Sequence, residues 1–197
     1  VSPNNPTGSV YSKETLTKLV EVAKAHNLVI FADEIYSKLI LDDEVPHVSL
    51  ASIDSEVPVI TFNGLSKNYV APGWRMGWAI FSGEKEIIGD YSEAVNRLVR
   101  SRLCANHPMQ FAIKASLEGP DTHIIEAKEK LRERRDLTYK RMNEIKHLSC
   151  VKPLGAFYAF PRINMDISDA DWVRKLLMET GVLCVHGEGF GQVAGSH

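Results

Sequence analysis

The sequence predicts an α/β protein in which a mostly parallel sheet with helices is followed by a smaller α+β unit. An amphipathic helix pattern through residues 16–23 leads directly into a continuously apolar run at residues 28–32, which is the rhythm of a parallel sheet. Two more apolar runs, at residues 59–62 and 78–81, enclose a loop that is rich in glycine. Further along the chain the pattern changes to a long charged helix and then to short strand and helix segments.

The first helix is expected to begin after Ser12, whose hydroxyl suits the position that caps a helix. Its apolar side chains recur at helical spacing, at Leu16, Leu19, Val20 and Ala23. Asn27 is suited to a left-handed stop after that helix. The run at residues 28–32 contains no polar residue, so we expect a strand that is buried on both faces and ends at Asp33.

The middle of the chain reads as an irregular segment, two buried strands joined by a loop, and then helices. A helix is expected from Lys85 to Leu103, with an apolar stripe at Ile87, Ile88, Tyr91, Ala94, Val95, Leu98 and Val99. Pro108 suits the first turn of a second helix that ends near Gly119. The long helix at residues 121–147 carries a dense run of charges, which is typical of a solvent-exposed helical face.

The last part of the chain reads as a small α+β unit. A pair of strands is expected at residues 150–151 and 156–160, joined by a turn. Ser168 begins a capping box for a helix that Gly181 ends. A last strand is expected at residues 182–185.

Composition limits the class of protein. With 44% hydrophobic residues, 24% charged residues and a formal net charge of -2, the chain has an ordinary globular composition and no excess charge for a nucleic-acid partner. The three cysteines are scattered beside apolar residues, which indicates buried free thiols and no metal site. No apolar run approaches the roughly 18 residues of a membrane span and no signal peptide is visible, so we expect a cytoplasmic protein. The chain starts without methionine, and we expect that both ends are cut from something longer.

The loop at residues 64–77 is the strongest candidate for a functional segment. Lys67 lies between two apolar strands, where sheets present reactive groups on loops, and burial favours the neutral amine that adds to a carbonyl. Ser66 and Arg75 offer a hydroxyl and a guanidinium, which suit a phosphate group. An exposed lysine and arginine in an ordinary loop would be the simpler interpretation of this segment taken alone.

Further polar groups fall at the ends of the predicted strands: an amide, a carboxylate and a phenol. In a parallel sheet such ends meet at one edge, so we expect them near the lysine loop. Together these groups match pyridoxal 5'-phosphate, which has an aldehyde, a pyridine nitrogen, a 3-hydroxyl and a phosphate. The matching partners are Lys67 for the aldehyde, Asp33 for the ring nitrogen, Asn5 and Tyr36 for the 3-hydroxyl, and Ser66 and Arg75 for the phosphate.

The sequence resembles the class I and II aminotransferases of fold type I over essentially its whole length. The order and spacing of four motifs carry this resemblance: residues 4–8, residues 32–36, the Ser66-Lys67 pair with Arg75 following, and residues 155–158. Residues 62–67 and 102–106 make the chain most similar to the alanine and tyrosine aminotransferase-like branch.

The resemblance implies transamination between an L-amino acid, expected to be alanine or glutamate, and a 2-oxo acid. It implies that Lys67 carries pyridoxal 5'-phosphate as an aldimine and moves a proton at the substrate α-carbon, with Asp33 and Tyr36 as further catalytic residues. It also implies that residues 1–119 are the C-terminal part of the large cofactor-binding domain and that residues 120–197 are a truncated small domain. The full-length parent is expected to be a homodimer.

The sequence departs from the family pattern in three places. Members of the family often carry a hydroxyl residue three positions before the lysine, where this chain has Gly64. The upstream half of the large domain is absent, and residues 187–191 are not followed by the arginine motif that binds the substrate carboxylate. We therefore expect the 197-residue chain alone to bind the cofactor weakly and to turn over poorly.

Several alternatives stay open from the sequence. A pyridoxal phosphate-dependent β-carbon–sulfur lyase would use the same Lys67, Asp33 and Tyr36, and a regulatory module that senses the cofactor would keep the fold. No basic helix-turn-helix segment is visible to support the regulatory module. Gly155 and Tyr158 are expected to serve the fold of the small domain, while Asn106 and His186 are weaker candidates for the cleft.

Overall fold

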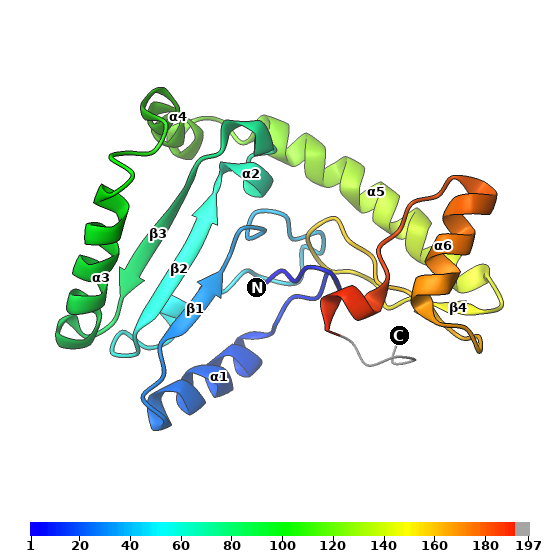
Figure 1. The fold of residues 1–197 in the computed structure, drawn as a ribbon, viewed down its shortest axis with the longest axis horizontal. Helices are drawn as coiled ribbons and strands as arrows, with labels where there is room; N and C mark the ends of the chain where they lie inside the picture. Colours follow the sequence, from blue (N-terminus) through cyan, green and yellow to red (C-terminus); the bar gives the residue numbers. More distant parts are fainter. Residues whose placement is uncertain (192–197) are drawn as a thin grey trace.

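The computed structural model describes residues 1–191, and its centre is a three-stranded sheet (Figure 1). The strands are β1 (Ile30–Asp33), β2 (Val59–Gly64) and β3 (Gly77–Ser82), in the order β1-β2-β3. β1 and β2 are parallel, whereas β2 and β3 are antiparallel. The three strands fall where the sequence predicted them. Asp33, the last residue of β1, is paired with Phe62, so β1 and β2 end at the same edge.

One face of the sheet is covered by α1 (Lys13–Ala25). Ser12 caps this helix by accepting a hydrogen bond from the Thr15 backbone N–H, and Asn27 has the left-handed φ of 52° that was predicted. Side chains of α1, β1, β2 and the residues just before β2 form the core between them, consisting of Val20, Ala23, Ile30, Ala32, Val57 and Val59.

The prediction that residues 28–32 are buried on both faces is wrong. β1 is shorter than that run, and its residues alternate between buried and exposed positions, with Phe31 58% exposed. Among the described residues, α1 covers the face that carries Ile30, while Phe31 stacks on Phe62 and meets only the edge of Tyr91. β3 is likewise more exposed than predicted, because its outer edge has no neighbouring strand in the described chain.

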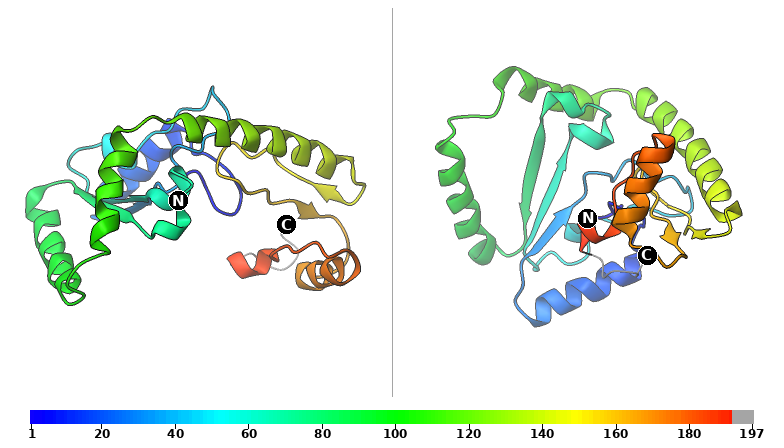
Figure 2. Two further views of the ribbon diagram at one scale, coloured as in Figure 1. Left: turned by 90° about the horizontal axis from the view of Figure 1, so that it is seen from above. Right: turned by 45° about the vertical axis from the view of Figure 1, so that its right-hand side comes forward.

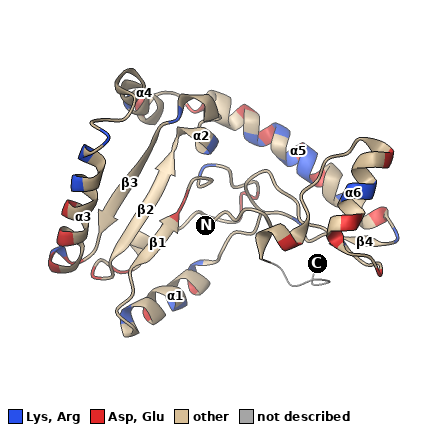
Figure 3. Ribbon diagram, in the orientation of Figure 1, with Lys and Arg blue, Asp and Glu red and all other residues tan. Residues whose placement is uncertain are grey.

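Three helices follow the sheet: α3 (Lys85–Arg100), α4 (His107–Glu118) and α5 (Thr122–Glu144). All three were predicted, although the apolar stripe of α3 is largely exposed and only Ile88 is buried. α5 runs from the sheet to the far part of the molecule, with charges along its length (Figures 2 and 3). Its charged run is not wholly solvent-exposed, because Arg135 is buried and donates hydrogen bonds to the Leu41 and Pro153 carbonyl oxygens.

The far part of the molecule contains a two-stranded antiparallel sheet, β4 (Leu148–Ser149) and β5 (Arg162–Ile163), and the helix α6 (Asp169–Thr180). Ser168 caps α6 and Gly181 ends it with a φ of 75°, as predicted. The strands predicted at residues 150–151, 156–160 and 182–185 are not formed. The backbone near Ala156 instead bonds to loops, with Ala156 donating to the Leu39 carbonyl and having a left-handed φ of 57°.

Two further observations concern the chain as a whole. Within residues 1–191, no helix combines the length and the apolar character needed to cross a bilayer. The three cysteines are free thiols, and only Cys150 is buried, so the prediction of buried thiols is wrong for Cys104 and Cys184.

Candidate active site

Lys67 lies in a single helical turn, α2 (Leu65–Asn68), that begins directly after β2. The side chain is half-buried, and its Nζ lies 5.4 Å from the centre of the Phe157 ring, a cation–π distance. It borders a cavity of about 300 Å³ that Ser66, Leu131 and Phe157 also line. The amine is therefore held at the sheet edge in contact with solvent-accessible space.

Gly64 allows the sheet to deliver Lys67 in this way. A Cβ atom on Gly64 would lie 2.7 Å from the Met76 carbonyl oxygen and 3.0 Å from the Gly77 Cα. No side chain fits between these backbones, because β2 and β3 meet here at the pair Gly64 and Gly77. With glycine at this position, β2 and β3 approach each other more closely than a side chain would allow.

Ser66 and Arg75 meet beside the lysine, as the sequence predicted. The Arg75 Nη1 lies 3.5 Å from the Ser66 Oγ and donates a hydrogen bond of 2.7 Å to the Pro72 carbonyl oxygen. Arg75 is exposed and has a left-handed φ of 56° at the end of the short 3-10 helix η2 (Pro72–Trp74). The contact places a hydroxyl and a guanidinium with free N–H donors side by side, which suits an anion.

Asp33 ends β1 at the same edge. Its Oδ1 accepts a 3.1 Å hydrogen bond from the Ile35 backbone N–H, and the residue is exposed. Because β1 is parallel to β2, the carboxylate and the α2 turn that carries Lys67 both follow strand ends on this side of the sheet. The predicted convergence of these two strand ends is therefore found.

Tyr36 is only 4% exposed, and its hydroxyl lies 2.7 Å from that of Tyr158. Burial, followed by the hydrogen bond with Tyr158, raises the pKa of Tyr36 well above its ordinary value, although Asn5 acts in the opposite direction. The Tyr36 phenol is therefore protonated at neutral pH. Its ring also packs edge-on against Phe157, which links it to Lys67.

Asn5 reaches the Tyr36 phenol from a turn. The turn is stabilised by Asn4, whose Oδ1 accepts from the backbone N–H and the hydroxyl of Thr7. Residues 1–4 contain no strand, and the assignment of Asn5 to a strand end stays a prediction. The predicted proximity of Asn5 and Tyr36 is nevertheless found.

Sequence reasoning missed Tyr158 and Phe157 as residues of this site. Tyr158 was assigned to the fold of the small domain, whereas its hydroxyl bonds to Tyr36 and its neighbour Phe157 contacts Lys67. The motif at residues 155–158 was the available signal. Gly155 does serve the fold, because a Cβ atom there would lie 2.8 Å from the Pro3 side chain.

The two weaker cleft candidates lie elsewhere. Asn106 is exposed at the start of α4. His186 lies beside Asp169 and Glu188, with their ligand-type atoms within 4.8 Å of one another, at the start of α6 and of η3 (Gly187–Phe190). α6 and η3 lie away from α2 in Figure 1, whereas α4 packs against the apolar cluster that contains Leu65.

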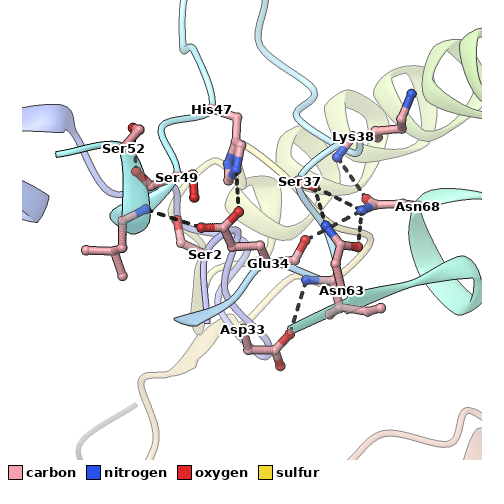
Figure 4. A network of polar contacts seen from close by, with 12 residues as sticks. Ser2, Asp33, Glu34, Ser37, Lys38, His47, Ser49, Ser52, Asn63 and Asn68 are labelled. Atoms are coloured by element: carbon pink, nitrogen blue, oxygen red, sulfur yellow. Dashed lines mark hydrogen bonds and ion pairs between the residues drawn. The ribbon is translucent and has the colours of Figure 1, made fainter. Parts of the chain in front are cut away.

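Behind Asp33, the carboxylate of Glu34 is buried and is stabilised by polar partners (Figure 4). Its Oε1 accepts a 3.2 Å hydrogen bond from the Leu50 backbone N–H, and its Oε2 lies 3.1 Å from the His47 Nε2. Burial alone raises the pKa of Glu34, but hydrogen bonds from His47, Ser49 and Leu50 outweigh it, so the pKa is lowered. These contacts join Glu34 to His47 and Leu50, which lie in the irregular segment before β2.

Comparison with known proteins agrees with this geometry. The family described as aminotransferase class I and II matches residues 1–196. An alanine aminotransferase of Mycobacterium bovis is 43% identical over 100% of this chain and 47% of its own length. The glutamate-pyruvate aminotransferase AlaA of Haemophilus influenzae is also 43% identical, over 100% of this chain and 50% of its own length.

A solved structure of alanine aminotransferase from Pyrococcus furiosus superposes with a TM-score of 0.94 at 44% identity, covering 98% of this chain and 50% of that chain. This chain therefore spans about half the length of the relatives it matches, and over that length it has the mixed α/β fold of the fold type I aminotransferases. The chain belongs to the class I and II aminotransferase family.

Proposed function

We propose that this chain carries the lysine-bearing part of the active site of a pyridoxal 5'-phosphate-dependent aminotransferase. One observation carries the proposal: the Lys67 amine shares one sheet edge with the Asp33 carboxylate, the Tyr36 phenol and the Ser66–Arg75 pair. The reaction moves an amino group between an L-amino acid and a 2-oxo acid. Family membership supports this class of reaction.

The side chains fit the cofactor in number and in chemistry. Arg75 is exposed and uses Nη1 toward Pro72 and Ser66, so its other N–H groups are available to a phosphate. Asp33 is exposed, and an acceptor oxygen remains to hold a proton on a ring nitrogen. The protonated Tyr36 phenol has a single O–H, which can rotate from Tyr158 to donate to a 3-oxygen, with Asn5 as its neighbour.

When bound, the cofactor supplies a carbonyl carbon for an amine and a ring that accepts electrons. The residues of this chain would bind it and move protons. Arg75 and Ser66 bind the phosphate, Asp33 holds a proton at the ring nitrogen, and Tyr36 orients the ring through the 3-oxygen. The free Lys67 amine carries a proton to and from the substrate α-carbon.

We infer alanine or glutamate as the amino donor, and pyruvate or 2-oxoglutarate as the acceptor. The support is the names of the relatives, which are alanine aminotransferase and glutamate-pyruvate aminotransferase. A β-carbon–sulfur lyase would use the same residues, and product analysis with cystathionine separates the two reactions. A homodimeric, cytoplasmic parent protein is part of the same proposal.

The test is borohydride trapping in the natural polypeptide that contains this chain. Wild type with added pyridoxal 5'-phosphate should gain a visible absorbance band, and reduction should fix the cofactor covalently to the peptide that contains Lys67. Lys67→Ala should lose both signals. Lys130→Ala is the matched control, because Lys130 lines the same cavity and should leave both signals unchanged.

Transamination is measured in the same preparations by pyruvate formation from alanine with 2-oxoglutarate. A covalent cofactor on another lysine, or trapping that persists in Lys67→Ala, would disprove the assignment of Lys67. Formation of an elimination product, without transfer of the amino group from alanine to 2-oxoglutarate, would favour the lyase.

A further inference from the structure

A buried carboxamide lies directly behind Lys67. Asn68 is 2% exposed, and its side chain makes three close hydrogen bonds (Figure 4). Its Nδ2 donates its two hydrogens to the Asn63 Oδ1 at 2.8 Å and to the Ser37 Oγ at 2.9 Å, and it lies 3.5 Å from the Glu34 carbonyl oxygen. Its Oδ1 accepts from the Lys38 backbone N–H at 2.8 Å.

The partners of Asn68 belong to the segments that carry the other groups of the site. Residues 34–38 form the turn that follows β1, and this turn includes Tyr36 and begins next to Asp33. Asn63 lies near the end of β2, just before the α2 turn, where its Oδ1 also accepts from the Gly64 backbone N–H. One side chain therefore connects the turn after β1 with the turn after β2.

The α2 turn needs such an anchor because it contains only four residues. A single helical turn does not hold itself, since nucleating a helix costs more than one hydrogen bond returns. Leu65 anchors the start of the turn by packing in a buried apolar cluster. At the other end Tyr69 packs in the same cluster and Asn68 adds the polar contacts to the turn after β1, so Lys67 lies between two anchored positions.

Resting on the proposed function, we propose that Asn68 is a positioning residue for the cofactor site. Its carboxamide sets the distance between the Lys67 amine and the Asp33–Tyr36 side of the site, so that one cofactor reaches both. An aspartate has the same shape but no N–H donors, and it would leave the Ser37 and Asn63 oxygens facing a carboxylate. An alanine would leave the same groups without a partner.

A purely structural role is the competing explanation, and Asn143, which is exposed where Asn68 is buried, provides a control for the loss of amide hydrogen bonds. Asn143 also uses both ends of its amide, donating to the Tyr139 and Cys150 carbonyl oxygens and accepting from the Cys150 backbone N–H. Its hydrogen bonds join α5 to Cys150, the residue after β4, and none of them is with a proposed site residue. Asn143→Ala therefore reports the cost of losing a structural amide alone.

The experiment compares wild type, Asn68→Ala, Asn68→Asp, Asn63→Ala and Asn143→Ala in the natural polypeptide that contains this chain. Three quantities are measured: the thermal midpoint of the cofactor-free protein, the affinity for pyridoxal 5'-phosphate with its borohydride trapping on Lys67, and the pH midpoint of the cofactor absorbance band. We expect both Asn68 variants to lose about 10- to 100-fold in affinity and to shift the pH midpoint, because losing one charge-assisted contact to the cofactor changes a binding constant by about that factor. Asn63→Ala should change both in the same direction.

Asn143→Ala should lower the thermal midpoint and leave affinity, trapping and pH midpoint at wild-type values. Asn68 variants that behave as Asn143→Ala does would overturn the positioning role while leaving the proposed function intact. Wild type that fails to bind or trap the cofactor would overturn the proposed function and, with it, this inference. If Asn68→Ala does not fold, Asn68→Asp and Asn63→Ala still give the comparison.

Discussion

The hydroxyl groups of Tyr36 and Tyr158 form a pair that is closed off from bulk water on the Tyr36 side. Because the bond to Tyr158 raises the pKa of Tyr36, its removal should lower that pKa toward the value set by burial. We therefore predict that Tyr158→Phe lowers the pH at which Tyr36 ionises and costs about 0.5–1.5 kcal/mol of unfolding free energy. Ultraviolet titration of tyrosinate, with Tyr36→Phe to assign the signal, measures the first effect.

Tyr139→Phe is the control, because Tyr139 lies on α5 away from the phenol pair. It should leave the titration of Tyr36 unchanged. Identical titration curves for Tyr158→Phe and wild type would mean that the two hydroxyls are not bonded in solution.

Glu34 gives the second prediction at the scale of a single residue. Its folded-state pKa is lowered from 4.5 by His47, Ser49 and Leu50, so folding gains stability from the ionised form. That stability is fully present above about pH 4.5 and is lost as the pH falls through the lower folded-state pKa. Glu34→Gln should therefore be less stable than wild type at neutral pH and should flatten the acid side of the curve of stability against pH.

Urea unfolding at several pH values between neutrality and the acid transition measures this difference. Glu14→Gln is the control, since Glu14 is exposed and its ion pair within residues 1–191 is with Lys18 on the same helix. A difference between Glu34→Gln and wild type that stays constant through the acid range would contradict the prediction.

Candidate site residues could be recognised in the sequence where they lie together in a motif. Contacts between residues that are far apart in the sequence could not be recognised. Lys67, Ser66 and Arg75 lie within one loop, and the structure places them together; their catalytic and binding roles stay predictions. Tyr158 and Tyr36 are 122 residues apart in sequence, so nothing local shows that their hydroxyls meet. Arg135 was assigned to a solvated face for the same reason, since its carbonyl partner in Leu41 is 94 residues away.

At the scale of elements, the α2 turn ends in an unusual backbone conformation. Val70 follows it with a left-handed φ of 55°, and its side chain is 55% exposed. This conformation costs an L-residue about 1–2 kcal/mol, whereas glycine adopts it freely at an entropic cost of roughly 0.5–1 kcal/mol. We predict that Val70→Gly raises the unfolding free energy by about 0.5–1 kcal/mol, measured by urea unfolding.

The reverse substitution is available at Gly181, the residue that ends α6. Gly181 has a φ of 75°, and nothing lies within 4 Å of the position of a Cβ atom, so Gly181→Val tests the backbone penalty alone. It should lose about 0.5–1 kcal/mol, because the backbone penalty is partly offset by the smaller conformational entropy of valine in the unfolded chain. A destabilised Val70→Gly beside a destabilised Gly181→Val would show that the Val70 side chain makes contacts that outweigh its strain.

The helices were predictable because each carries its own signals, as Ser12 and Ser168 illustrate at the starts of α1 and α6. The strands were less predictable, because an apolar run does not show which other strand it pairs with. Residues 156–160 look like a strand, yet the backbone there bonds to the loop at Leu39, and residues 182–185 find no ladder partner in the described chain. The prediction that β1 is buried on both faces was wrong for a related reason, since apolar character does not show whether a second layer covers Phe31.

At the scale of the whole molecule, the order of helices and strands was enough to predict the α/β class. The order of the three strands in the sheet comes from the structure, because periodicity alone does not give it. The division of the chain at residue 119 stays a prediction. α5, which begins just after it, packs against loops of the sheet side through Arg132 and Arg135 and reaches β4 at its other end.

The uncovered face of the sheet leads to the last prediction. Phe31 and Phe62 stack there with Tyr91 at their edge, and all three rings remain substantially exposed in the chain described. Contiguous exposed apolar surface of this kind drives association between molecules. We predict that the 197-residue chain binds a hydrophobic dye and self-associates as its concentration rises, and that Phe31→Thr reduces both, because threonine keeps the strand preference and removes most of the apolar area.

Val22→Thr is the matched control: Val22 is exposed to nearly the same extent, 55% against 58%, but lies on α1, away from the three rings. Sedimentation velocity and dye fluorescence on the three proteins measure the effect, and an equal reduction by both substitutions would show that the open sheet face is not the surface responsible.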